Sequence, residues 1–179
     1  MRHPLPLALL AALAALHASA FRVAGAEPVQ VHLRWEYKDF APRVEIAEAK
    51  PSAPLWDTRS VGSPKLAPIG ARIPDGTFGL EPGQSKRIAL LVTNPTDQTL
   101  FFFASPHGVL PVEHSLGFHF KCLCVGEAYR VQPGETWYRI VELQLGRHFE
   151  GQEITLTHTL IGIDGKRAAA YPPRRSLEE

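Results

Sequence analysis

Apolar and polar residues alternate strictly along residues 29–37 of the sequence. Val, Val, Leu, Trp and Tyr occupy every second position there, and Gln, His, Arg and Glu stand between them. Successive side chains of a β-strand point to opposite faces, so this period of two predicts a strand with one buried face. Beyond residue 26, no window has apolar residues at helical spacing without an intervening Pro or Gly. The alternation therefore directs the chain toward β structure.

Further strand-like segments follow, separated by turn signals, at residues 44–46, 86–93, 99–105, 136–145 and 153–163. Two of the turns contain a Pro-Gly pair, at residues 82–83 and 133–134, where Pro fixes φ and Gly permits a positive φ. Residues 50–82 contain six Pro and are expected to form a long loop with at most short strand pieces.

About seven short strands separated by turns predict an all-β fold, an immunoglobulin-like antiparallel β-sandwich. We assign this domain to residues 27–165. Residues 166–179 are expected to form a polar C-terminal tail.

The first 26 residues have the pattern of an export signal. Arg2 precedes an uncharged apolar stretch over residues 4–16, and small residues then offer cleavage sites after Ala20 and after Ala26. An uncleaved membrane anchor is the alternative, but a membrane-spanning helix needs about 20 apolar residues. We therefore expect a cleaved signal peptide and a periplasmic or otherwise exported protein, which contacts a membrane only through a client or an uncleaved signal.

The charge balance excludes one broad class of function. Lys and Arg total 19 against 18 Asp and Glu, a formal net charge of +1, which does not suit a protein that binds nucleic acid through phosphate contacts. The sequence also has no Gly-rich phosphate loop, no His-Glu-x-x-His and no Gly-x-Ser-x-Gly motif. We do not expect an enzyme.

The chain has two cysteines, Cys122 and Cys124. On a regular strand they would share one face with Cα atoms about 7 Å apart, farther than a disulfide usually spans. Two thiolates on one face are suited instead to a soft metal ion, and with so few ligands Cu(I) is favoured over Zn²⁺, which usually takes four. The alternatives are that both cysteines are small buried hydrophobic residues, or that they form a disulfide despite their short separation.

Three motifs occur in a distinctive order around this pair: TNPTDQTL at residues 93–100, GFHFKCLC at residues 117–124 and YRVQPGET at residues 129–136. This order resembles the copper chaperones for cytochrome c oxidase assembly (CtaG type). The resemblance implies an immunoglobulin-like sandwich that binds Cu(I) through the thiolates of Cys122 and Cys124 and delivers it to the oxidase.

The match covers about residues 80–145, and the chain departs from the family pattern in several respects. The positions after the two cysteines, which are aromatic in that family, are Leu123 and Val125 here. The family's usual membrane anchor is replaced by an expected signal peptide. The resemblance is therefore to a divergent relative, for which a different copper client is an open alternative.

Histidines upstream of the cysteines are further candidate ligands, because imidazole binds copper. His107, His114 and His119 all lie there, and His119 is nearest to the pair. On a regular strand, however, His119 would share a face with Lys121, opposite both cysteines. The chain's single Met is Met1, which disfavours a blue-copper site with an axial Met ligand.

The sequence thus predicts an exported Cu(I)-binding protein, a chaperone that hands copper to a cuproenzyme such as cytochrome c oxidase. The partner would be a copper-receiving client protein, and a copper-linked homodimer is expected if a second chain completes the site. The rival hypothesis is a structural or adaptor β-sandwich domain whose thiols have no metal role.

Overall fold

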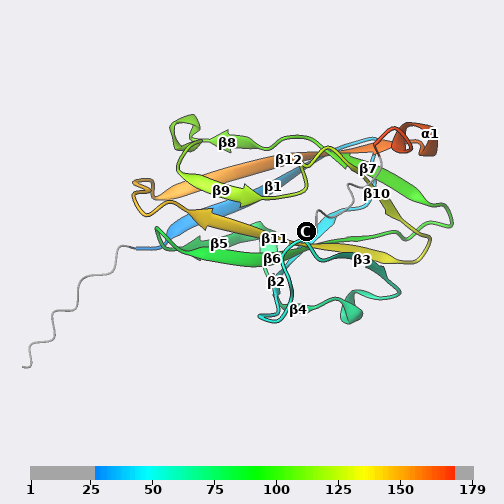
Figure 1. The fold of residues 1–179 in the computed structure, drawn as a ribbon, viewed down its shortest axis with the longest axis horizontal. Helices are drawn as coiled ribbons and strands as arrows, with labels where there is room; N and C mark the ends of the chain where they lie inside the picture. Colours follow the sequence, from blue (N-terminus) through cyan, green and yellow to red (C-terminus); the bar gives the residue numbers. More distant parts are fainter. Residues whose placement is uncertain (1–26, 172–179) are drawn as a thin grey trace, which may run out of the picture.

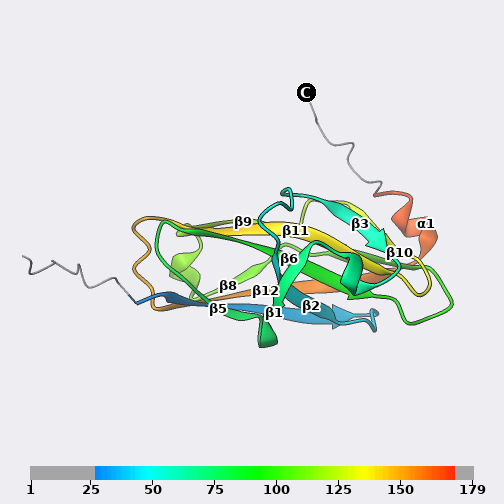
Figure 2. The same cartoon turned by 90° about the horizontal axis from the view of Figure 1, so that it is seen from below.

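The computed structural model describes residues 27–171, which form two six-stranded sheets packed face to face (Figures 1 and 2). The first sheet has the strand order β10-β7-β12-β1-β5, and β8 pairs with β12. Its strands are β1 (Val29–Lys38), β5 (Thr77–Leu80), β7 (Leu100–Ala104), β8 (Gly108–Leu110), β10 (Ala128–Val131) and β12 (Glu153–Ile163).

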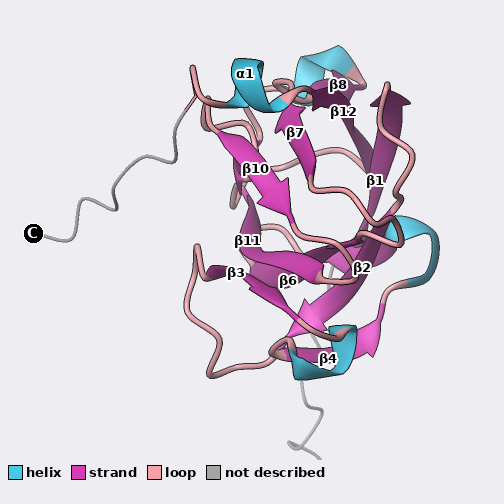
Figure 3. Cartoon of the chain, turned by 90° about the vertical axis from the view of Figure 1, so that its right-hand side faces the viewer, coloured by secondary structure: helices cyan, strands magenta, loops and turns pink. Residues whose placement is uncertain are grey.

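The second sheet has the order β3-β11-β6-β2-β4, and β9 pairs with β11. Its strands are β2 (Val44–Ala49), β3 (Thr58–Val61), β4 (Ile69–Arg72), β6 (Ser85–Thr93), β9 (Phe118–Lys121) and β11 (Thr136–Leu145). Three short 3-10 helices lie between strands, at Pro64–Leu66, Pro74–Gly76 and Val112–His114. The helix α1 (Gly165–Ala168) lies at one end of the molecule, near β7 (Figure 3).

The strands pair antiparallel with one exception, the parallel pair β1 and β12 at the centre of the first sheet. In this register Trp35 lies opposite His158, so a central aromatic ring and a central histidine become neighbours. The parallel pair joins the beginning and the end of the folded chain, which are far apart in sequence.

The core lies between the two sheets and is built from the inward faces predicted by the alternation. Val31 and Leu33 of β1 are buried, as are Ile154, Leu156 and Leu160 of β12. Burial of apolar side chains of this size stabilises the fold by about 1.5–3 kcal/mol each.

The prediction of an all-β sandwich is confirmed. The described residues contain twelve strands rather than about seven, because several strands of three or four residues are too short to give a periodic signal. Three of these short strands, β3, β4 and β5, fall in the Pro-rich stretch of residues 50–82, as the expected short strand pieces allow.

The folded domain extends beyond residue 165, into the segment expected to be a polar tail. Asp164 caps α1 by accepting a hydrogen bond from the Arg167 backbone N–H. The Tyr171 carbonyl accepts a hydrogen bond from the backbone N–H of Ala128, and its ring contacts Phe103. The start of this segment is therefore part of the sandwich.

The expected signal peptide lies outside the described residues. Within residues 27–171, no helix combines the length and the hydrophobicity that a membrane crossing requires.

Candidate metal centre

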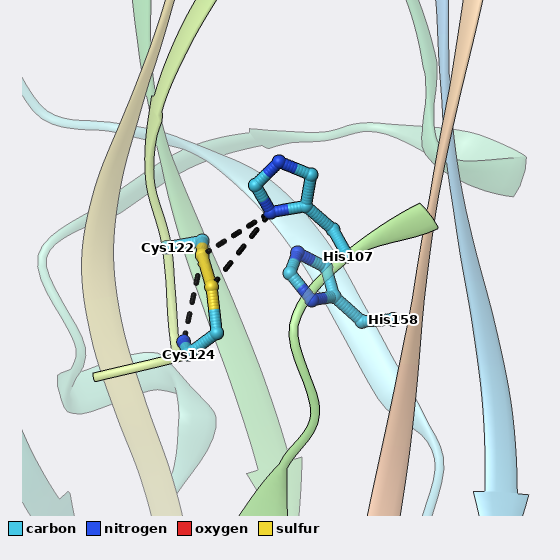
Figure 4. A group of neighbouring side chains, drawn as sticks. All are labelled: His107, Cys122, Cys124 and His158. Atoms are coloured by element: carbon cyan, nitrogen blue, oxygen red, sulfur yellow. Dashed lines mark hydrogen bonds between the residues drawn. A yellow bond between two sulfur atoms is a disulfide. The ribbon is translucent and has the colours of Figure 1, made fainter. Parts of the chain in front are cut away.

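Four side chains with metal-binding atoms converge at one point between the sheets: His107, Cys122, Cys124 and His158. Their ligand atoms all lie within 4.8 Å of one another (Figure 4). His107 comes from the connection between β7 and β8, the cysteines from the segment after β9, and His158 from the middle of β12. The two sheets therefore contribute jointly to one cluster.

The cysteine segment is not a regular strand, which corrects the expectation of an extended Cys-x-Cys run. β9 ends at Lys121, whose partner on β11 is Glu142, and the chain then bends at Leu123, between the two cysteines. The bend brings the Cα atoms of Cys122 and Cys124 to 5.7 Å, within the usual disulfide range, and the two residues are joined by a disulfide. The alternative of a disulfide between near neighbours is thus the state that the structure shows.

The His107 ring lies against the two sulfurs. Its Nδ1 atom is 3.8 Å from Sγ of Cys122 and 3.7 Å from Sγ of Cys124. Two aromatic rings of β9, Phe118 and Phe120, lie 5.6 Å and 5.9 Å from the His107 ring between centroids. Partial burial lowers the pKa of His107, so the imidazole favours its neutral form, which is the form that binds metals.

His158 is fully buried, with 0% of its surface exposed, and its ring stacks on Trp35 at 5.2 Å between centroids. Its Nδ1 atom lies 3.4 Å from the carbonyl oxygen of Ser105. A carbonyl only accepts hydrogen bonds, so Nδ1 carries the proton and Nε2 keeps a free lone pair.

The Nε2 atom of His158 has no hydrogen-bond partner among the described residues. Burial, together with the nearby His107, lowers the pKa of His158 to about 4, so the ring is neutral at pH 7. A buried nitrogen with an unused lone pair is costly in an apolar interior, and nearly all such atoms have partners. Here it belongs to a residue whose ligand atom lies within 4.8 Å of two sulfurs and a second imidazole, which makes His158 a candidate metal ligand.

The distances from His107 to the two sulfurs fit one bound ion. Metal–sulfur bonds of about 2.3 Å and metal–nitrogen bonds of about 2.0 Å, at trigonal or tetrahedral angles, place nitrogen and sulfur roughly 3.5–3.7 Å apart. The His107 nitrogen is 3.7–3.8 Å from the sulfurs. Ligation requires thiolates, so the disulfide must first be reduced. The backbone N–H of Cys124 points at Sγ of Cys122 at 3.4 Å and would stabilise the thiolate formed there.

The structure brings together the two predicted cysteines and His107, one of the three histidines weighed from the sequence. His119 is exposed on β9, opposite Gln144, and lies outside the cluster. His114 also lies outside it and packs against Phe149.

His158 is the cluster member that sequence reasoning missed. It stands in the alternating inward face of β12, where Ile154, Leu156 and Leu160 are its companions. A histidine in a row of core positions is a detectable signal, because a buried polar side chain needs a partner.

The fold and the cluster define an all-β sandwich domain with a partly buried Cys₂His₂ group. A family model described as a domain of unknown function, DUF8709, matches residues 29–163, and the chain belongs to that family. All four residues of the cluster lie within the matched range. Comparison with curated proteins gives no match.

Proposed function

We propose that this domain binds one Cu(I) ion through the thiolates of Cys122 and Cys124, with His107 and His158 completing the site. The unpartnered, unprotonated Nε2 atom of His158 is the observation that carries the proposal. It supplies a ligand that the fold has desolvated and left without another role. Soft thiolate ligands select Cu(I), and imidazole is an accepted copper ligand.

The burial of the four ligands supports a carrier. Cys122 and His158 are buried, whereas His107 and Cys124 are only half-buried. One thiolate and one imidazole are thus accessible from the surface, where the ligands of another protein can replace them one at a time. The copper would then pass to a client cuproenzyme, and the resemblance of the three sequence motifs favours cytochrome c oxidase as that client.

Loading begins with the disulfide. An external dithiol reduces it, which breaks the S–S bond, adds one proton to each sulfur and leaves the reductant as a disulfide. Cu(I) then displaces the thiol protons. Because one chain supplies four ligand atoms, copper binding does not require a second chain, although a copper-linked homodimer remains an outcome that size-exclusion chromatography of the loaded protein would reveal.

A structural Zn²⁺ site is the second candidate, since Cys₂His₂ is a common ligand set for tetrahedral zinc. Structural zinc sites are usually closed and support the fold. This domain has an extensive apolar core, and two of the four ligands are half-buried, which favours a transferable ion over a structural one.

Competitive titration with a chromogenic Cu(I) chelator tests the proposal on the reduced protein under anaerobic conditions. The wild type should bind one Cu(I), Cys122→Ser and Cys124→Ser should each lose tight binding, and His107→Ala or His158→Phe should weaken it at least tenfold. His119→Ala is the matched control and should bind like the wild type. Equal affinity of the wild type and the double Cys→Ser variant would contradict the proposal, and Zn²⁺ that Cu(I) fails to displace would favour the zinc site.

Delivery needs a separate measurement. Cu(I)-loaded protein mixed with the purified copper-binding domain of an oxidase subunit should lose its copper to that domain. Complete retention of the copper would exclude this client.

A further inference from the structure

The segment between β9 and β10 that carries the cysteines is held from its inner side. Leu123, between the two cysteines, has a buried side chain that belongs to the main core. Its carbonyl oxygen accepts two hydrogen bonds, one from the backbone N–H of Val125 at 2.9 Å and one from the hydroxyl of Tyr129 at 3.0 Å. The turn that separates the two sulfurs is therefore fixed at its middle residue.

Tyr129 is itself rigidly placed on β10. Its ring packs against Phe102 and Trp137, with centroids 5.1 Å and 4.9 Å away. Burial raises the pKa of Tyr129 well above its ordinary value, so the hydroxyl keeps its proton and remains a donor. The hydrogen bond to Leu123 lies in the interior, where water does not compete for it.

A buried ion pair lies at the end of the same segment, just before β10. Arg139 of β11 donates to Glu127 at 2.7 Å, and both side chains are less than a tenth exposed. The Arg139 guanidinium also lies 5.4 Å from the centre of the Tyr129 ring. Tyr129 is thus supported on several sides, and its hydroxyl is directed at the residue between the cysteines.

We propose that Tyr129 is a positioning residue for the Cys122–Cys124 pair. A disulfide and a chelated metal ion both require the two sulfurs to lie on one side of the turn, whereas the free dithiol does not. The Tyr129 hydrogen bond fixes the turn in that arrangement and so stabilises the disulfide and the metal-bound form relative to the free dithiol. The copper part of this inference rests on the proposed function, and the thiol–disulfide part does not.

The test uses Tyr129→Phe, which removes the hydroxyl and keeps the ring in the core. Tyr138→Phe is the matched control, because the Tyr138 ring is also in the core and its hydroxyl donates to Asp57 at 2.8 Å, away from the cysteines. Two quantities are measured on each protein: the Cu(I) affinity of the dithiol form, and the dithiol–disulfide equilibrium in reduced and oxidised dithiothreitol.

Tyr129→Phe should weaken Cu(I) binding roughly tenfold, the lower end for losing a residue that orients a ligand. It should also shift the dithiol–disulfide equilibrium tenfold toward the dithiol, a midpoint potential about 30 mV less negative. Tyr138→Phe should leave both quantities at the wild-type value.

Wild-type values of both quantities in Tyr129→Phe would overturn the inference, and so would equal shifts in Tyr138→Phe, which would indicate general destabilisation. If the wild type fails to bind Cu(I) while the potential still shifts in Tyr129→Phe alone, the proposed copper function fails and the positioning role stands.

Discussion

Two buried polar centres in this domain differ in how completely their hydrogen bonds are satisfied. Asn94, in the turn between β6 and β7, and His158, in the metal cluster, are both 0% exposed. Their surroundings, however, assign them different roles.

Asn94 uses every polar atom of its side chain. Its Nδ2 donates to the carbonyls of Gln98 at 2.7 Å and Val131 at 3.0 Å, and its Oδ1 accepts from the backbone N–H and the hydroxyl of Thr96 at 3.0 Å and 2.7 Å. The Asn94 backbone also bonds to the second Pro-Gly turn, through Gly134 and Glu135. This side chain joins two turns and has no free donor or acceptor left for a ligand.

The cluster around His158 shows the opposite condition. Its Nε2 atom and the Nε1 atom of the stacked Trp35 are both buried without a hydrogen-bond partner among the described residues. Such atoms are rare in native folds. Nε of Arg139 is a third one among the described residues, but it belongs to a side chain already paired with Glu127. The Asn94 side chain, with all its hydrogen bonds made, therefore stabilises the fold. The His158 side chain still has a free nitrogen lone pair that can bind an ion.

The largest effect that would test this contrast is the loss of Asn94. Asn94→Ala removes four side-chain hydrogen bonds, one of them buried and three part-buried, and should lower the free energy of unfolding by about 3–5 kcal/mol, at about 1 kcal/mol for each bond. Urea unfolding measures the change, and Cu(I) affinity of the folded fraction should stay within about twofold of the wild type. A loss of copper affinity without a loss of stability would reverse the assigned roles.

A smaller effect is expected in the acid stability of the metal-free protein. The pKa of His158 is about 4 in the folded state because of burial, against about 6.5 in an unfolded chain. The unfolded state therefore binds the proton first, so the contribution of neutral His158 is fully present above pH 6.5 and is lost as the pH falls toward 4. The loss is on the order of 3 kcal/mol.

His158→Phe should remove this part of the pH dependence and keep the stack on Trp35. Urea unfolding of the oxidised protein between pH 4 and pH 7 measures how the free energy of unfolding depends on pH. His119→Ala is the control and should show the same pH dependence as the wild type. Parallel loss of stability in the wild type and His158→Phe would show that protonation of His158 does not destabilise the fold.

The sequence predicts the long strands of this fold well and the metal cluster only in part. β1 and β12 follow from the alternation of single segments, because the side-chain period of a strand is local information. The parallel pairing that places Trp35 beside His158 is not local, since it joins the two ends of the domain.

The cluster was incompletely predicted for the same reason. Cys122 and Cys124 are evident as neighbours in the sequence, but the bend after Lys121 depends on where β9 stops pairing with β11. His107 and His158 reach the cysteines only because the two sheets pack together. The face that each residue would take on a regular strand does not predict the close approach of the two sulfurs.

X-ray absorption spectroscopy of the reduced, Cu(I)-loaded protein tests most directly whether these four residues hold one ion. The expected spectrum contains two sulfur ligands at about 2.3 Å and one or two nitrogen ligands at about 2.0 Å. Loss of nitrogen scattering in the His107→Ala and His158→Phe variants would assign the imidazoles. A copper environment of sulfur alone, or one without sulfur, would contradict the Cys₂His₂ centre.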